Sequence, residues 1–283
     1  MIPNVAWTYW AQGREDFNTC LSLCEKSWKT IGGFDSIVVL DRENLADYLD
    51  LSELPPTFST LPVQFQSDLV RLHVLARHGG IWLDTSTFVS ANVSKWLRTL
   101  NLKEGLFLFQ NAGGGVGGRL FEIGFIAAEP ANDFLVSWAT ELGKFFARAK
   151  VHGAHSAFSP TPVLWKKLFG VLNKYLRKST NRSAWWARFP LRILPFYPYF
   201  ITYYVANRLL QIAPYRGFLQ RVHFVDAQEY LSARKLADKA GWIAAVQKLE
   251  TVAVPIHDLE FRLPMAEGDS EAFKGYLDRA MHH

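Results

Sequence analysis

The most regular hydrophobic pattern in the chain lies between residues 65 and 83. Apolar side chains recur there at intervals of three and four residues, which predicts an amphipathic helix over residues 65–78. We expect Ser67 or Asp68 to be its N-cap and Gly79 to end it. The apolar positions that define this stripe are Phe65, Leu69, Leu72, Leu75 and Ala76.

A short apolar run at residues 81–83 follows the helix and predicts a buried strand that ends at Asp84. Asp68 and Arg71 are three positions apart, so they project from the same side of the helix's first turn. Because the glycine pair lets the chain fold back, we expect Asp68, Arg71 and Asp84 to meet at the carboxyl end of the strand, where α/β sheets bind ligands. The alternative is a surface ion pair beside a carboxylate that caps the next turn.

Strand and helix patterns alternate through the rest of the chain, which predicts an α/β fold with a mostly parallel sheet. Strands are predicted over residues 2–10, 36–40, 106–109, 121–128 and 222–225, and helices over residues 17–28, 132–150 and 242–248. Asp41 is expected to cap a helix that runs through Leu45 and Leu49, and another helix follows Asp226. We expect a single domain over residues 1–283.

The composition narrows the function classes. Of 283 residues, 49% are hydrophobic and 20% are charged, which is typical of a globular protein. The net charge of +5 suits phosphorylated ligands or an anionic membrane surface, and without a basic motif it does not predict a nucleic-acid partner. No leader opens the chain, and no apolar run approaches the ~20 residues of a spanning helix, so we expect a cytoplasmic protein. Cys20 and Cys24 are expected to be reduced core thiols.

Residues 67–86 resemble the sugar-binding region of one glycosyltransferase group. This group of "capsular polysaccharide synthesis" and "DXD sugar-binding" proteins is related to yeast initiating mannosyltransferases and to the large clostridial toxins. Its hallmark is a serine-aspartate pair, an arginine three residues after the aspartate, a glycine pair, and an apolar strand that ends in Asp-X-Asp. The chain matches at Ser67, Asp68, Arg71, Gly79, Gly80, Ile81, Trp82, Leu83 and Asp84. It departs at Ser86, where the second aspartate is expected, and this departure concerns metal binding more than membership.

The resemblance implies a GT-A-like nucleotide-sugar-binding domain and a role for particular residues. The catalytic candidates are Asp68, Arg71, Asp84 and Glu122, and the donor-binding candidates are Trp7, Thr8, Tyr9, Asp68, Arg71, Asp84, Ser86, His257 and Arg262. Mn²⁺ or Mg²⁺ is the implied cofactor, with Asp84 and His257 as its ligands. If no metal is used, Arg71 or Arg262 would neutralise the donor diphosphate instead.

Two of these residues have ordinary alternatives. Trp7 follows the pattern of a core residue as well as it follows that of a ring on which a base stacks. Glu122 has the position of an outward residue on an edge strand as well as that of an acceptor contact.

Three further stretches are candidates for functional roles. Residues 111–119 (NAGGGVGGR) lack the lysine of a phosphate-binding loop and predict a hairpin or lid. Residues 152–162 suit a loop over a pocket, in which His155 and Ser156 are candidate phosphate or acceptor contacts. Residues 163–221 mix cations with aromatic rings, which predicts a helical insertion that contacts an anionic membrane. The alternative is a helical cover whose cations face water.

These features predict a glycosyltransferase that moves a sugar from a nucleotide-diphosphate donor to a bacterial surface polysaccharide or its lipid-linked precursor, at the inner face of the membrane. Retention of the anomeric configuration is implied by the resemblance alone. Two alternatives remain open. One is a toxin-like enzyme that places a single sugar on a protein hydroxyl. The other is a non-catalytic sugar- or lipid-binding module, which Ser86 makes conceivable.

Overall fold

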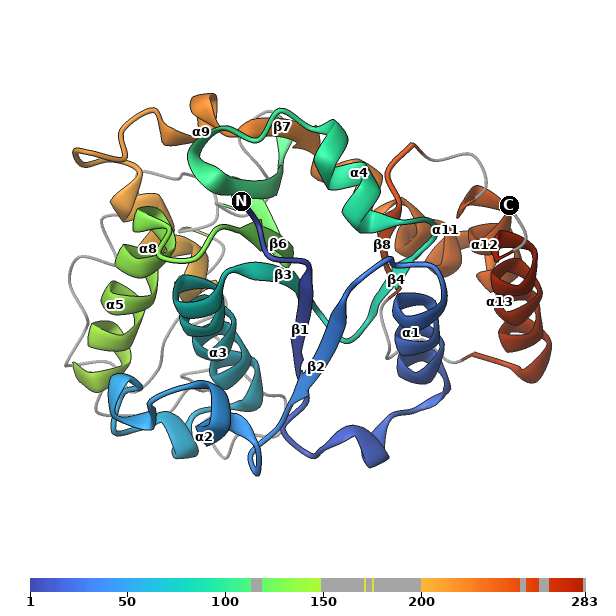
Figure 1. The fold of residues 1–283 in the computed structure, drawn as a ribbon, viewed down its shortest axis with the longest axis horizontal. Helices are drawn as coiled ribbons and strands as arrows, with labels where there is room; N and C mark the ends of the chain where they lie inside the picture. Colours follow the sequence, from blue (N-terminus) through green and yellow to red (C-terminus); the bar gives the residue numbers. More distant parts are fainter. Residues whose placement is uncertain are drawn as a thin grey trace.

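A six-stranded sheet forms the centre of the molecule (Figure 1). The computed structural model describes residues 1–112, 119–148, 200–249, 253–259 and 265–281, together with residues 171 and 175. The strands lie in the order β2-β1-β3-β6-β5-β7. Their bounds are β1 Val5–Tyr9, β2 Ser36–Leu40, β3 Gly80–Leu83, β5 Leu106–Gln110, β6 Phe121–Ala128 and β7 His223–Asp226.

Five of these six strands point the same way. β1 pairs in parallel with β2 and β3, and β5 pairs in parallel with β7. β6 alone is antiparallel to its neighbours, β3 and β5. The carboxyl ends of the five parallel strands therefore meet at one edge, and the predicted α/β class with a mostly parallel central sheet is confirmed.

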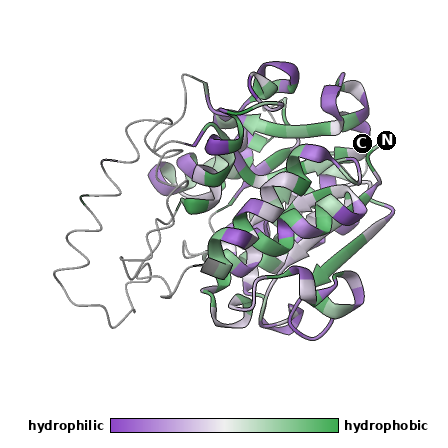
Figure 2. Ribbon diagram, turned by 90° about the vertical axis from the view of Figure 1, so that its left-hand side faces the viewer, coloured by the Kyte–Doolittle hydropathy of each residue, from purple (hydrophilic) through white to green (hydrophobic). Residues whose placement is uncertain are grey.

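Helices cover both faces of the sheet (Figure 1). One face packs against α2 Leu45–Tyr48, α3 Val63–His78, α5 Asp133–Arg148, α8 Ile201–Leu209 and α9 Phe218–Arg221. The apolar core on the other side contains residues of α1 Thr19–Thr30, α4 Val93–Thr99, α10 Ala227–Tyr230, α11 Ser232–Ala240, α12 Trp242–Leu249 and α13 Glu267–Ala280. Figure 2 shows mostly hydrophobic strands between helices that carry both hydrophilic and hydrophobic positions. The sheet therefore separates two apolar cores.

A second sheet of two strands lies beside the α1 face. β4 (Thr87–Val89) pairs antiparallel with β8 (Ile256–Asp258), so that Thr87 lies opposite Asp258 and Phe88 lies opposite His257. This pairing brings a C-terminal strand next to the residues that follow Asp84. The sequence pattern did not predict a strand at residues 256–258.

Helix α3 begins earlier than predicted. Its first residue is Val63, and Pro62 occupies the N-cap position. Proline is tolerated there because its fixed φ and its missing N–H do not conflict with the start of a helix. Ser67 and Asp68 are therefore not N-caps, because both residues lie within the helix rather than at its start. The predicted end is confirmed, since Gly79 follows the helix with a φ of 64° that disfavours other residues.

Two other element boundaries also differ from prediction. α2 is a single turn that ends at Tyr48, and Leu49 has an extended backbone. Asp41 does not cap that helix, because its carboxylate accepts hydrogen bonds from the backbone N–H groups of Glu43 and Asn44 ahead of it. A helix after Asp226 is confirmed, and the Asp226 side chain caps it.

Several predictions from the sequence concern residues that the structure does not describe. They are residues 113–118 of the glycine-rich stretch, the loop with His155 and Ser156, residues 163–199 apart from 171 and 175, and Arg262. Among the described residues, Cys20 and Cys24 are buried free thiols, as predicted. No helix in the described ranges is long and apolar enough to cross a membrane.

Candidate functional site

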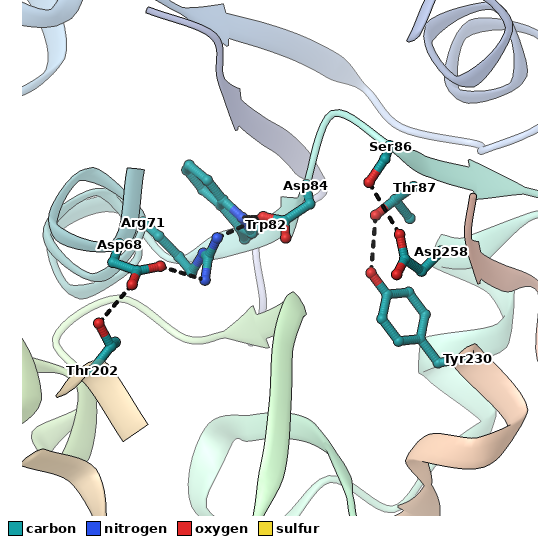
Figure 3. A network of polar contacts seen from close by, with 9 residues as sticks. All are labelled: Asp68, Arg71, Trp82, Asp84, Ser86, Thr87, Thr202, Tyr230 and Asp258. Atoms are coloured by element: carbon teal, nitrogen blue, oxygen red, sulfur yellow. Dashed lines mark hydrogen bonds and ion pairs between the residues drawn. The ribbon is translucent and has the colours of Figure 1, made fainter. Parts of the chain in front are cut away.

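The guanidinium of Arg71 joins two carboxylates at the carboxyl end of β3 (Figure 3). Nη1 of Arg71 lies 3.1 Å from Oδ1 of Asp68, and Nη2 lies 2.6 Å from Oδ1 of Asp84. The indole Nε1 of Trp82 donates to the same Asp84 oxygen over 2.8 Å, and the guanidinium lies 5.1 Å from the centre of the Trp82 ring. The structure therefore brings together the three residues that the sequence pattern predicted to meet.

The contact of Arg71 with Asp68 is largely buried, and the contact with Asp84 is open to solvent on the Asp84 side only. The Arg71 side chain is 5% exposed, against 37% for Asp84. Burial alone would lower the pKa of Arg71, but the charges of Asp84 and Asp68 raise it above its usual value. The alternative of a surface ion pair is therefore wrong. The turn after Asp84 is held by a backbone bond from the Thr87 N–H to the Asp84 carbonyl, so the Asp84 carboxylate is not needed as its cap.

Asp68 also contacts helix α8. The Thr202 hydroxyl donates to Oδ2 of Asp68 over 2.6 Å, so both oxygens of this carboxylate have a partner. Burial raises the pKa of Asp68, while the charge of Arg71 and the bond from Thr202 oppose that shift. The helix that follows the long undescribed segment is thus connected to the motif by a hydrogen bond.

A second polar cluster lies on the other side of Asp84 (Figure 3). The Ser86 hydroxyl donates to Oδ1 of Asp258 over 3.1 Å, and Nη1 of Arg234 lies 2.9 Å from Oδ2 of Asp258. Burial raises the pKa of Asp258 to about 6, and the nearby charge of Asp84 acts in the same direction. The Tyr230 hydroxyl lies 3.3 Å from the Thr87 hydroxyl, and burial raises the pKa of Tyr230 well above its usual range.

Gly124 of β6 stands between the two clusters. Its carbonyl accepts the Asp84 backbone N–H over 2.8 Å. A Cβ at position 124 would lie 2.3 Å from the Tyr230 hydroxyl and 3.0 Å from Oδ2 of Asp84. The absence of a side chain therefore lets the Tyr230 hydroxyl and the Asp84 oxygen that does not contact Arg71 approach the β6 backbone closely.

Glu122 lies two residues before Gly124 on β6, with its side chain buried. Its carboxylate accepts from Nδ2 of Asn111 at 3.1 Å and pairs with Nη1 of Arg119 at 3.2 Å. β6 lies between β3 and β5, so the alternative that placed Glu122 on an edge strand is wrong. Glu122 therefore lies two residues before Gly124, whose carbonyl accepts the Asp84 N–H, in the strand next to β3.

The three candidates on β1 lie in different surroundings. The Trp7 indole donates to the Gly79 carbonyl over 2.9 Å and packs against Tyr48 and His78, at the opposite end of the strands from Asp84. This is the core position that its alternative predicted. Thr8 is buried, and its hydroxyl has no hydrogen-bond partner among the described residues. The Tyr9 hydroxyl bonds to Gln66 of α3.

His257 does not join the candidate site. Its side chain is fully buried, Nε2 lies 2.9 Å from the Ser90 hydroxyl, and burial lowers its pKa to about 3. Alternate residues of a strand point to opposite faces, so the side chain next to Ser86 is Asp258. The prediction that His257 is a metal ligand is therefore corrected. Among the described residues, no three His, Cys, Asp or Glu side chains cluster as a metal site.

The sequence pattern missed four residues of this site, namely Thr202, Tyr230, Arg234 and Asp258. None belongs to the motif, and each is brought in by tertiary packing. One signal was available for Asp258, because it follows His257 in a segment that we already expected to return over the donor site. Strand alternation within that segment would have shown that only one of the two residues points to the site.

A family model described as "Capsular polysaccharide synthesis protein" matches residues 2–152, which is more than half of the chain. An "O-glycosyltransferase braB" of Annulohypoxylon truncatum is 27% identical over 168 residues. That alignment covers 53% of this chain and 39% of the relative, so the chain spans about two fifths of the relative's length.

Two solved structures resemble the chain weakly. "PaToxG Glycosyltransferase" has a TM-score of 0.41 at 13% identity, and the match covers 74% of this chain and 87% of that one. The apo-form glycosyltransferase GlyE of Streptococcus pneumoniae has a TM-score of 0.42 at 11% identity, covering 99% of this chain and 62% of that one. Both scores are too low to support an argument. The family match includes the whole Asp68 to Asp84 motif, and the chain therefore belongs to the capsular polysaccharide synthesis protein family.

Proposed function

We propose that the protein is a glycosyltransferase with a nucleotide-diphosphate sugar as donor. The observation that carries this proposal is the contact of Arg71 with both Asp68 and Asp84 at the carboxyl end of β3. In open α/β sheets this edge is where ligands bind. Family membership and the similarity to a protein named as an O-glycosyltransferase support the same activity.

The reaction would break the bond between the anomeric carbon and a diphosphate oxygen and would form a bond from that carbon to an acceptor oxygen, which loses its proton. Negative charge develops on the departing diphosphate, so stabilising that charge is the main task of the site. Each terminal nitrogen of Arg71 donates to a carboxylate. Its proposed role is therefore to hold Asp84 in place.

We propose that a divalent cation, Mn²⁺ or Mg²⁺, binds next to Asp84. Such ions take oxygen ligands, and Mg²⁺ commonly binds through one or two carboxylates together with substrate phosphates. Oδ1 of Asp84 accepts from Arg71 and Trp82, whereas Oδ2 lies close to the Gly124 backbone. When bound there, the cation would offset the charge of the leaving diphosphate.

The acceptor belongs to the same proposal. We infer a glycan or a lipid-linked glycan of a surface polysaccharide, and retention of configuration, from the family alone. Glu122 is the candidate contact on the acceptor side, because it is a buried carboxylate two residues before Gly124 on β6. Thr8 and Tyr9 are candidate donor contacts at the carboxyl end of β1.

We further propose that residues 163–221 form an insertion within one domain. The expected membrane contact is corrected for its described part, because α8 and α9 pack on the sheet through buried side chains such as Tyr204 and Phe218. The proposal that this insertion contacts an anionic membrane from its inner face is therefore limited to residues 163–199. The support is the sequence, where cations and aromatic rings alternate.

The protein should co-sediment with anionic vesicles and be released at high salt, because salt screens the attraction. Charge reversal at Arg182, Arg188 and Arg192 should weaken sedimentation. Equal binding to neutral vesicles would contradict the electrostatic part.

The activity is tested by incubating the protein with a panel of nucleotide sugars and following donor hydrolysis with Mn²⁺, with Mg²⁺ and with excess chelator. Asp84→Ala should lower turnover by about a thousandfold or more, since it removes the carboxylate proposed to hold the cation that offsets the developing charge. Asp47→Ala, an exposed carboxylate on α2, is the matched control.

Three results would count against the proposal. Absence of binding and turnover with every donor would refute the glycosyltransferase function. Full activity in excess chelator would refute the proposed role of the divalent cation. Unchanged activity in Asp84→Ala would place the active site elsewhere.

A further inference from the structure

Position 86 holds a serine where the family motif has its second aspartate, yet a carboxylate is present there. It comes from strand β8, since the Ser86 hydroxyl donates to Oδ1 of Asp258. The register of β4 and β8 fixes this neighbour, because Thr87 lies opposite Asp258 and the Leu259 N–H donates to the Ser86 carbonyl. The pairing of two strands, rather than a loose side chain, sets the position of Asp258.

The backbone of Gly124 lies between Asp84 and the Asp258 cluster, in close contact with both Asp84 and Tyr230. Position 124 lacks a Cβ that would come within 3.0 Å of Oδ2 of Asp84 and 2.3 Å of the Tyr230 hydroxyl. Tyr230 lies between the two clusters, because its hydroxyl packs against Gly124 and lies 3.3 Å from the hydroxyl of Thr87, the residue opposite Asp258. The side chains of Asp84 and Asp258 are 37% and 13% exposed, so the two differ in their access to solvent.

The balance of charge in these two clusters favours a cation. Asp84 pairs with Arg71 and Asp258 pairs with Arg234, while Arg71 is shared with Asp68 on its far side, so the two clusters together carry one more carboxylate than guanidinium. A donor diphosphate would add further negative charge to the same place. The oxygen-rich donor set suits a hard divalent ion, which would offset both.

We propose that Asp258 is the second carboxylate of the cation site and that Ser86 is the positioning residue that holds it across from Asp84. The carboxylate that the family motif carries at position 86 is supplied in this chain by a strand 172 residues later. This inference rests on the proposed function, because the cation is the one implied for the donor diphosphate.

The affinity for Mn²⁺ tests the proposal independently of catalytic turnover. Titration calorimetry and the electron paramagnetic resonance signal of free Mn²⁺ would be recorded with the ion alone and with UDP, GDP, ADP or CDP added. Asp258→Asn should weaken Mn²⁺ affinity by about tenfold or more, as loss of an anionic ligand does at metal sites. Adding Ser86→Asp to Asp258→Asn should restore most of that affinity, because it returns a carboxylate to the motif position.

The controls separate this inference from a change in folding and from the proposed activity. Asp238→Asn, an exposed residue on the helix that carries Arg234, should leave Mn²⁺ affinity unchanged. Asp258→Glu keeps the charge and should lose less affinity than Asp258→Asn, and thermal unfolding checks that each variant is folded. Wild-type affinity in Asp258→Asn, no recovery in the double variant, or no Mn²⁺ binding by the wild type would each overturn the proposal. Mn²⁺ binding with the expected variant pattern, but no turnover of any donor, would refute only the glycosyltransferase function.

Discussion

The two halves of the candidate site are built in different ways. Arg71 and Asp84 are 13 positions apart, and one helix, one glycine turn and one strand bring them together. Ser86 and Asp258 are 172 positions apart and meet only because β4 pairs with β8. The first half follows from local geometry, whereas the second requires most of the chain to be folded before it exists.

The two halves also differ in how far relatives inform them. The family match ends at residue 152, so it includes Asp68, Arg71 and Asp84 but neither Tyr230 nor Asp258. A function inferred from the family is therefore carried by the local half. The remote half lies beyond the residues that the family model matches. The partner of Ser86, which stands where the motif has an aspartate, is therefore known from the structure alone.

The largest effect on stability is expected from Arg71→Met in the local half. It leaves the carboxylates of Asp68 and Asp84 without their shared cation, and breaking such a buried contact costs about 3–5 kcal/mol. Urea unfolding measures the loss. Arg77→Met is the matched control on the same helix, because its half-exposed pair with Glu53 is worth about 1 kcal/mol or less. Similar midpoints for the two variants would show that Arg71 is not central to the local half.

Gly124→Ala is expected to disturb both halves at once. The new Cβ would meet the Tyr230 hydroxyl and Asp84, and overpacking of this kind costs about 1–3 kcal/mol. Removing the hydroxyl with Tyr230→Phe should recover part of this loss in the double variant. A double-mutant cycle with no coupling would contradict the contact between β6 and the remote half.

A smaller effect is expected where the local half contacts α8. Thr202→Val removes the hydrogen bond to Oδ2 of Asp68 and should cost about 1 kcal/mol or somewhat more, because the acceptor is partly buried and charged. Thr202→Ser keeps the hydroxyl and serves as the control. If the valine and serine variants unfold at the same urea concentration, α8 is held against the motif by packing alone.

The smallest effect concerns His73, which lies on the face of α3 away from Arg71. Its replacement tests whether groups outside the site contribute to the loss of folding stability in acid. Burial lowers its pKa, although the nearby Glu53 opposes the shift. The unfolded chain takes up a proton near pH 6.5 while the folded protein still holds His73 neutral, so its contribution to stability is present above that pH and is lost as the pH falls below it. His73→Gln should therefore show a smaller loss of urea midpoint between pH 7.5 and pH 5.5 than the wild type. Parallel curves would contradict this.

Much of the fold was predictable because its signals are local. The stripe that includes Leu69 and Leu72 predicted α3, and its glycine stop and the apolar run before Asp84 predicted the turn and β3. The N-cap prediction failed because serine and aspartate cap a helix only where the backbone is still extended. Pro62 starts the helix one turn earlier, so these residues were already helical.

The remote half of the site was not predictable in the same way. The choice between His257 and Asp258 depends on which face of β8 packs on the core, and an isolated three-residue strand does not carry a pattern long enough to show this. The positions of Thr202 and Tyr230 depend on helices that follow long intervening segments. Strand pairing and helix packing over such separations are set by the whole core rather than by neighbouring residues.

The reversal of β6 has a consequence for protein engineering. Because this strand runs against β3 and β5, its first residues stand at the edge where the other strands end, and Glu122 reaches that edge from a chain direction opposite to that of Asp84. Asn111 and Arg119 precede this start and contact the Glu122 carboxylate, whereas the pairing of β3 with β6 runs through residues 125–128. A library of variants at these two positions would therefore diversify the surroundings of Glu122 while the scaffold that holds Asp84 against Arg71 stays constant.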